Sequence, residues 1–211
     1  MKNHLADIRK EYLKGHISVE TMPENPLEAL QTWVNQAIEA EVEEPTAMSI
    51  STVSEKNIPS SRQVLLKEIQ QEGLVFYTNY SSKKGQEIEN NPNVAVNFFW
   101  PTLERQVRVQ CIASKVSPEE SDRYFYSRPK TSQVGAIVSN QSSIIGSNLD
   151  LETEIQHILE SNTEIKRPEN WGGYILRPNY FEFWHGRASR VHDRVSYDLD
   201  NGKWLKNRLA P

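Results

Sequence analysis

The sequence has a single cysteine, Cys111, among its 211 residues. One cysteine excludes a disulfide within the chain and a cysteine-based metal cluster. Because Cys111 lies in the apolar alternation VRVQCIAS, we interpret it as a small core residue. The five histidines are His4, His16, His157, His185 and His192. Their spacing matches no metal-ligand pattern, so we expect no bound metal.

Long apolar runs are also missing. No stretch approaches the ~20 apolar residues that cross a bilayer, and the first residues do not resemble a signal peptide. We therefore expect a cytoplasmic protein that does not enter membranes. The motifs G-x-G-x-x-G, the Walker loop, G-x-S-x-G and H-E-x-x-H are absent as well. Phosphate-loop, serine-nucleophile and zinc-hydrolase functions therefore have no support in the sequence.

Positive charge is in slight deficit, with 24 lysines and arginines against 28 acidic residues. The deficit lies in residues 1–60, with a net charge of −5, whereas residues 61–211 carry +1. This balance argues against nucleic-acid binding, which needs a continuous basic face. It permits a small phosphorylated ligand, which needs only a few cations in one pocket. The modest hydrophobic content, 37%, suggests that a partner subunit supplies some apolar burial.

Helix signals begin after a polar N-terminal arm, residues 1–25. Asn25 as N-cap and Pro26 at the first helical position predict a helix that ends at the acidic residues 41–44. Ser117-Pro-Glu-Glu120 is a capping box for a second helix, which reaches residue 126. Further helices are expected near 82–91, from about 132, and over 149–160.

Strand patterns dominate the rest of the chain. They cover 47–53, 61–69, 73–79, 93–99, 104–116, 173–177, 180–185, 189–198 and 203–208. Asn201-Gly202 predicts a hairpin between the last two strands. Many strands and few helices indicate a mainly β (α+β) antiparallel barrel with peripheral helices. We expect residues 26–211 to form a single domain.

Residues 181–194, FEFWHGRASRVHDR, place three arginines and two histidines after aromatic residues. On a regular strand, Arg190, His192 and Arg194 would share one face. Three cations on one face repel each other unless water or a bound anion screens them. A solvated edge is one interpretation. The other is a site for an anionic, planar ligand, with Trp184 as a flat wall.

A second group of polar residues suits a monophosphate. Tyr124 and Arg128 are four residues apart, hence on one face of the predicted helix. Ser132 stands where the next helix is expected to begin. A helix N-terminus with a serine hydroxyl and a nearby arginine binds phosphate well. The alternative is an N-cap serine beside a solvated arginine.

A third group consists of Arg62, Lys67, Lys83 and Lys84. Lys83 and Lys84 fall in the first turn of a predicted helix, where lysines oppose the helix dipole unless an anion sits there. Arg62 and Lys67 have opposite parity on a regular strand. A shared pocket would therefore need a bulge, or ligands on both sides.

Several motifs occur in an order that resembles one enzyme family. They are RQVLLK (62–67), VFYTN (75–79), SKK (82–84), TLERQV (102–107), YFYSRPKTSQVGA (124–136), NQSS (140–143), FEFWHGRASRVHDR (181–194) and the terminal RLAP. From about residue 25 onward the chain resembles the pyridoxine/pyridoxamine 5′-phosphate oxidases, FMN enzymes that make pyridoxal 5′-phosphate. The most specific motifs are E-F-W followed by R-x-H-D-R, and Y-F-x-S-R-P.

The resemblance implies a split β-barrel homodimer with FMN at the dimer interface. It implies that FMN is bound by Arg62, Lys67, Tyr77, Thr78, Lys83, Lys84 and Gln106, with Gln141, Ser142, Trp184 and Arg194 reaching it from the partner side. It implies substrate contacts from Lys67, Tyr124, Arg128, Ser132, Arg190 and His192, the last two near the reacting carbon. In the arm, Arg9 and Tyr12 resemble the family's lid. Lys83 stands where the family more often has arginine, so its phosphate contact would be single rather than bidentate.

The implied reaction oxidises pyridoxine or pyridoxamine 5′-phosphate to pyridoxal 5′-phosphate, in vitamin B6 biosynthesis and salvage. A hydride passes from C4′ to flavin N5, and O₂ reoxidises the flavin to give hydrogen peroxide. Two alternatives stay open at this point. One is a split-barrel FMN reductase, or an oxidase of another substrate, which need not keep Tyr124, Arg128 and Ser132. The other is a non-catalytic module that binds FMN or pyridoxal phosphate.

Overall fold

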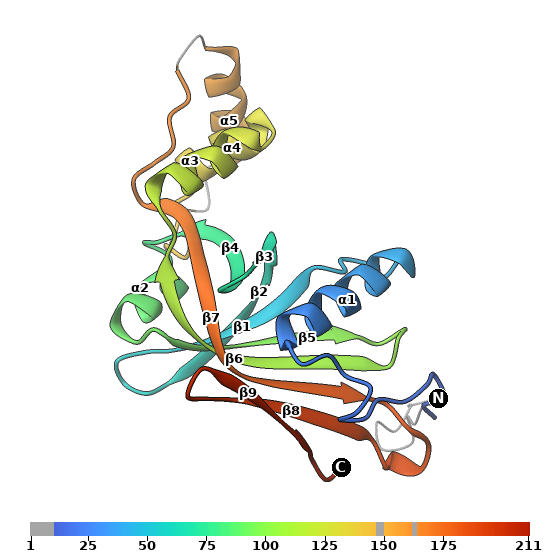
Figure 1. Ribbon diagram of the computed structural model, residues 1–211. Helices are drawn as coiled ribbons and strands as arrows, with labels where there is room; N and C mark the ends of the chain where they lie inside the picture. The colour runs from blue at the N-terminus through green and yellow to red at the C-terminus, as the bar shows by residue number, and fades with distance from the viewer. Residues whose placement is uncertain (1–10, 147–149, 162–163) are drawn as a thin grey trace. The chain divides into compact units, whose positions relative to one another are not determined.

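The computed structural model describes residues 11–146, 150–161 and 164–211. Its strands form a nine-stranded sheet in the order β2-β1-β5-β6-β7-β4-β3, with β8 paired to β7 and β9 paired to β8 (Figure 1). The pairs β3–β4, β4–β7, β7–β8 and β8–β9 are antiparallel. The predicted antiparallel sheet with peripheral helices is confirmed.

The helices are α1 (Pro26–Glu39), α2 (Lys83–Asn90), α3 (Pro118–Ser127), α4 (Lys130–Val138), α5 (Leu151–Glu160) and the 3₁₀ turn η2 (Ala188–Arg190). The strands are β1 (Ala47–Val53), β2 (Pro59–Leu65), β3 (Glu68–Gln70), β4 (Gly73–Asn79), β5 (Asn93–Trp100), β6 (Arg105–Lys115), β7 (Trp171–His185), β8 (Asp193–Asp200) and β9 (Lys203–Arg208).

The chain divides into two compact units. The first comprises the described parts of residues 1–49, 95–110 and 178–211, and the second those of residues 50–94 and 111–177. Both units are assembled from separate stretches of sequence. A single domain over residues 26–211 stays a prediction.

The core of the first unit forms around α1. The Asn25 side chain accepts a hydrogen bond from the Leu27 N–H (3.0 Å), which confirms the predicted cap. The buried face of the helix presents Trp33, whose ring meets those of Phe183 (5.1 Å between centroids) and Trp100 (6.5 Å) edge to face. Such aromatic pairs are favourable beyond the area that they bury, so they fix α1 against the strands of this unit.

The first unit also contains the β8–β9 hairpin. Asp200 pairs with Lys203 across the turn, and Asn201 and Gly202 both have positive φ, 47° and 77°. This is the geometry that two-residue hairpin turns require, and it confirms the prediction from Asn-Gly.

The predicted break between strands at 177 and 180 is wrong, because β7 continues through Pro178. The fixed φ of proline is compatible with extended backbone.

The second unit pairs β4 with β3 and with the first half of β7. The predicted strand 61–69 is interrupted at Leu66 and Lys67, where β2 has ended and β3 has not begun.

Three helices, α3, α4 and α5, gather at one end of this unit (Figure 1), and α4 packs against α5. The Ser117 hydroxyl accepts a hydrogen bond from the Glu120 N–H (3.1 Å), as the capping box predicts. Because α4 begins at Lys130, Ser132 lies within its first turn and not at its cap.

Among the described residues, no helix combines the length and the apolar character that crossing a bilayer requires.

We expect the first turn of α2 to tolerate only glycine at position 85. A Cβ there would lie 2.0 Å from the Tyr80 carbonyl oxygen, whereas a Cβ on Gly135, in α4, would meet nothing nearer than 3.9 Å. Gly85→Ala should lower the free energy of unfolding by roughly 1–3 kcal/mol or more, as overpacking does. Gly135→Ala should leave it unchanged or raise it by about 0.5–1 kcal/mol. Urea unfolding measures both, and equal effects would contradict this packing.

Candidate active site

The second unit contains a cavity of about 670 Å³. Its walls come from the end of β2, from β4, from the α3–α4 connection and from the residues that follow α4. Eight of the predicted site residues line it: Lys67, Tyr77, Thr78, Lys84, Tyr124, Arg128, Ser132 and Gln141. Lys67 reaches the cavity because it lies in the break between β2 and β3, which resolves the parity conflict with Arg62.

Three aromatic rings form one wall of the cavity. Tyr77 and Tyr124 stack with centroids 3.7 Å apart and planes 14° apart, and Trp171 lies parallel to both. Gly173 pairs with Tyr77 across the strands, and a Cβ on it would lie 2.8 Å from that ring, so glycine gives the tyrosine its room. Burial raises the pKa of Tyr77 to about 12, which keeps its hydroxyl protonated and able to donate. Trp171 was not among the residues predicted from the sequence, where its only signal was its place before two glycines.

Arg128, the C-cap residue of α3 just before α4, is a cation that lies against this aromatic wall. Its guanidinium carbon lies 4.7 Å from the Trp171 ring centroid, a cation–π contact. Its Nη1 is buried without a hydrogen-bond partner, and burial lowers the pKa of Arg128. The N-cap of α4 is Pro129, so no side chain caps this helix. An unpaired guanidinium nitrogen beside an uncapped helix N-terminus suits an anion.

Lys84 is the buried cation of the cavity. Its Nζ donates to Thr78 Oγ1 (3.0 Å), Gln141 Oε1 (3.1 Å) and Ser82 Oγ (3.4 Å). Burial, and then the neighbouring charge of Arg62, lower the pKa of Lys84 to about 8. Gln141 lies beside Thr78 and Lys84 of its own chain, and its reaching FMN from the partner side stays a prediction.

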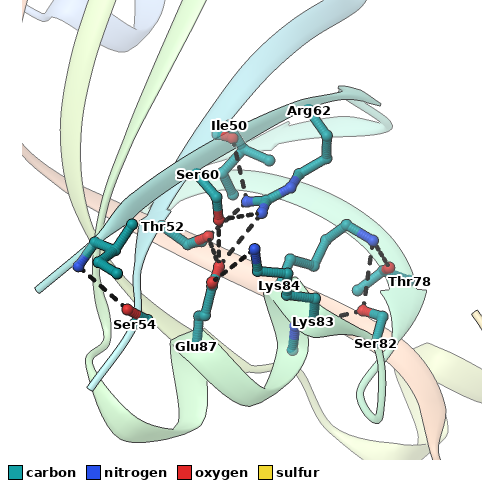
Figure 2. A network of polar contacts seen from close by, with 12 residues as sticks. Ile50, Thr52, Ser54, Ser60, Arg62, Thr78, Ser82, Lys83, Lys84 and Glu87 are labelled. Atoms are coloured by element: carbon teal, nitrogen blue, oxygen red, sulfur yellow. Dashed lines mark hydrogen bonds and ion pairs between the residues drawn. The ribbon is translucent and has the colours of Figure 1, made fainter. Parts of the chain in front are cut away.

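Arg62, Lys83 and Glu87 form a network next to Lys84 (Figure 2). Arg62 donates to Thr52 Oγ1 (2.5 Å), Ser60 Oγ (2.6 Å) and Glu87 Oε2 (3.3 Å). Lys83 Nζ lies 3.9 Å from Glu87 Oε1. Glu87 was not among the residues predicted from the sequence, although its place four residues after Lys83 was a signal for an ion pair on α2.

The first unit contains a separate group of predicted residues. The Tyr12 ring meets Trp184 and His192 edge to face at 5.6 and 5.7 Å between centroids. The backbone N–H of Arg187 donates to His192 Nδ1 (3.2 Å). Burial, and then the charge of Arg190, lower the pKa of His192, so its ring is neutral near pH 7.

Arg194 is held in this group from two sides. Its Nε and Nη2 contact Glu182 Oε1 at 3.0 and 2.9 Å, and its Nη1 donates to the Ala210 carbonyl (2.6 Å). Glu182, which is 3% exposed, also accepts from Arg108 Nη1 (3.0 Å).

The predicted alternation of Arg190, His192 and Arg194 on one strand is wrong. Arg190 belongs to η2, where Ser189 and Arg190 both have positive φ, and β8 begins only at Asp193. Two consecutive left-handed residues turn the chain before the strand starts, and sequence periodicity does not detect such a turn.

The predicted site residues therefore fall into two sets. In the first unit lie Tyr12, Gln106, Trp184, Arg190, His192 and Arg194, and in the second lie the eight cavity residues with Arg62, Lys83 and Ser142. Ser142 is exposed, with φ of 73°. Arg9 lies outside the described residues.

The cavity fits a phosphorylated aromatic ligand. It combines stacked rings, a buried lysine with a lowered pKa, and an arginine nitrogen without a partner. These residues suit FMN and a pyridine 5′-phosphate, each of which has a flat ring and a dianion. Within the described residues, no group of three or more histidine, cysteine, aspartate or glutamate side chains is arranged to hold a metal.

Comparisons with known proteins agree with this chemistry. The family profile described as "Pyridoxamine 5'-phosphate oxidase" matches residues 34–162, and "Pyridoxine 5'-phosphate oxidase C-terminal dimerisation region" matches residues 171–211. The pyridoxine/pyridoxamine 5′-phosphate oxidase of Mannheimia succiniciproducens is 48% identical over 98% of this chain and 99% of its own length. The protein of that name from Cytophaga hutchinsonii is 49% identical over the full length of both chains.

Solved structures show the fold. The crystal structure of PhzG from Burkholderia lata, in complex with tetrahydrophenazine-1-carboxylic acid, superposes with a TM-score of 0.87 at 26% identity, over 92% of this chain and 96% of that one. A pyridoxamine 5′-phosphate oxidase-related, FMN binding protein from Nostoc punctiforme gives 0.71 at 15% identity, over 90% and 100%. The expected split-barrel fold is confirmed.

The lowered pKa of Lys84 has a consequence for the ligand-free protein. Below about pH 8 the folded chain must hold a buried charge, whereas above it the amine loses its proton in the folded state and keeps it when unfolded. Stability due to this group therefore rises with pH between about 8 and the ordinary lysine value. The difference in free energy of unfolding between wild type and Lys84→Met should shift by about 1–2 kcal/mol in favour of wild type between pH ~7 and ~9.5.

Urea unfolding at both pH values tests this. The substitution also removes three hydrogen bonds, but that loss does not depend on pH. If the free energy of unfolding changes with pH in the same way for both proteins, the Lys84 amine titrates as a solvated lysine does, which would contradict the prediction.

Proposed function

The chain belongs to the pyridoxine/pyridoxamine 5′-phosphate oxidase family, and on that premise we propose how its residues divide the work of the reaction. The protein is an FMN-dependent oxidoreductase that converts pyridoxine 5′-phosphate and pyridoxamine 5′-phosphate to pyridoxal 5′-phosphate, in vitamin B6 biosynthesis and salvage. The observation that carries the division of roles is the cavity of the second unit, with Lys84 on one wall and Arg128 on another. Two separate cations suit two separate phosphates.

The cofactor side is the part of the cavity next to α2. When bound, FMN supplies the hydride acceptor and passes the electrons to O₂, which leaves as hydrogen peroxide. The residues that hold it are Arg62, Lys67, Tyr77, Thr78, Lys83, Lys84, Gln106, Gln141, Ser142, Trp184 and Arg194. The lowered pKa of Lys84 supports this assignment, because a phosphate dianion would compensate the buried charge.

The substrate side is the part of the cavity next to α4. The substrate phosphate is bound by Arg128, by the Tyr124 hydroxyl and by the N-terminal turn of α4, which includes Ser132. Lys67 lies between the two ligands. Arg128 meets the phosphate with a nitrogen that has no partner in the ligand-free protein. Contacts to this remote group position the reacting carbon without touching it.

Arg190 and His192 act at the reacting end of the substrate. Because the Arg187 N–H donates to His192 Nδ1, the neutral ring carries its proton on Nε2 and presents a donor there. This geometry favours an orienting hydrogen bond from His192 to the substrate. Tyr12 forms part of a lid, which its contact with Trp184 and His192 supports.

The protein is a homodimer, as the match of residues 171–211 to the family's dimerisation region indicates. We propose further that FMN binds at the interface between the two chains. The match to the dimerisation region supports this, because residues 171–211 contain Trp184 and Arg194, two of the residues assigned to FMN. The expected cytoplasmic location stays a prediction.

Anaerobic mixing tests the reaction directly. The protein is loaded with FMN, oxygen is removed, and pyridoxine 5′-phosphate is added while the visible spectrum is recorded. We expect the flavin band to bleach and to return in air with formation of the aldehyde. An unchanged spectrum with both this substrate and pyridoxamine 5′-phosphate would refute the assigned reaction, and reduced nicotinamides would be tried next.

Arg128→Ala should separate the two phosphate sites. We expect the Kd of pyridoxine 5′-phosphate to rise by roughly 10- to 100-fold, because a hydrogen bond to a charged group contributes about 1.5–3 kcal/mol. The Kd of FMN should stay unchanged. Arg123→Ala, an exposed arginine on α3, is the matched control and should change neither constant. Equal losses for both ligands in Arg128→Ala would refute the division of roles.

A further inference from the structure

Glu87 is a buried carboxylate at the centre of the network in Figure 2. It lies on α2, one turn after Lys83, and is only 5% exposed. Three donors converge on one of its oxygens, Oε2: Thr52 Oγ1 (2.5 Å), Ser60 Oγ (2.7 Å) and Arg62 Nη2 (3.3 Å). Its other oxygen, Oε1, makes no hydrogen bond and lies 3.9 Å from Lys83 Nζ.

This carboxylate is ionised in the folded protein. Burial alone would raise the pKa of Glu87, but hydrogen bonds from Thr52 and Ser60 and the charge of Arg62 together lower it below its ordinary value. A fixed negative charge therefore lies against Arg62 and Lys83 when no ligand is bound. These are two of the cations assigned above to the cofactor.

We propose that Glu87 is an internal counterion, which stands in for the cofactor phosphate on Arg62 and Lys83 and lowers the affinity of this chain for a phosphorylated flavin. The inference rests on the proposed FMN site. Without Glu87, Arg62, Lys83 and Lys84 would repel each other in the ligand-free protein, so the carboxylate stabilises the empty site. The same charge then opposes the incoming dianion.

The effect should depend on the phosphate and not on the flavin ring. Lys83 is largely exposed, so solvent screens this site, and Coulomb repulsion at a dielectric close to that of water predicts roughly 3- to 10-fold weaker binding of the dianion. Riboflavin has the same ring system without the phosphate, so Glu87 should not affect it. The ratio of the Kd of riboflavin to that of FMN isolates the charge effect from any general change in the fold.

Glu87→Gln removes the charge and keeps the shape. The amide oxygen can take the place of Oε2 and accept all three hydrogen bonds, while the amide nitrogen takes the place of Oε1, which accepts none. Glu89→Gln is the matched control, because Glu89 lies on the same helix, is exposed and pairs with Lys115. Quenching of flavin fluorescence by the apoprotein gives the Kd of FMN and of riboflavin for each protein.

We expect Glu87→Gln to raise the Kd ratio by roughly 3- to 10-fold through tighter FMN binding, and Glu89→Gln to leave it unchanged. If Glu87→Gln does not fold, Glu87→Ala also removes the charge and should raise the same ratio. An unchanged ratio would show that Glu87 is only structural, and a lowered ratio would show that it assists phosphate binding. Either result overturns the counterion role. If wild type binds neither flavin, the FMN assignment itself fails and the inference falls with it.

Discussion

Mutual repulsion of cations that are partly withdrawn from water is the constraint on which this site depends. Arg62, Lys83 and Lys84 gather at the N-terminus of α2, where the helix dipole opposes them as well. Burial, and then the charge of Arg62, lower the pKa of Lys84. The fold offsets the repulsion with hydroxyl acceptors on β1 and β2 and with the buried carboxylate of Glu87. Such a site favours a bound anion, because β2 and α2 bring the three cations close to one another.

Local sequence signals predicted the parts of the fold that local chemistry determines. The Asn25 cap, the capping box at Ser117 and the Asn201-Gly202 turn each depend on residues close in sequence, and each was confirmed. The family motifs also pointed to the residues that line the cavity. Where prediction was wrong, tertiary structure or an unusual backbone decided the outcome, as at Pro178 in β7 and at the left-handed Arg190.

Two contributors to the site could not be found from the sequence, because their roles arise only in three dimensions. Trp171 is far from Arg128 in the chain, and only the fold brings its ring under the guanidinium. In the sequence, Glu87 is only an acidic residue four positions after Lys83. Its importance comes from β1 and β2, which deliver Thr52, Ser60 and Arg62 to the same oxygen.

The strand pair β7–β8 has a consequence for how substitutions act in this protein. The segment that matches the family's dimerisation region, residues 171–211, also contains Trp184, His192 and Arg194. Under the proposed roles, a substitution in this segment would affect both subunit assembly and the chemistry of the site. The cavity residues of α3 and α4 lie outside that segment, so under the proposed roles a substitution at Tyr124 or Ser132 would change substrate binding while leaving the sequence of the dimerisation region intact.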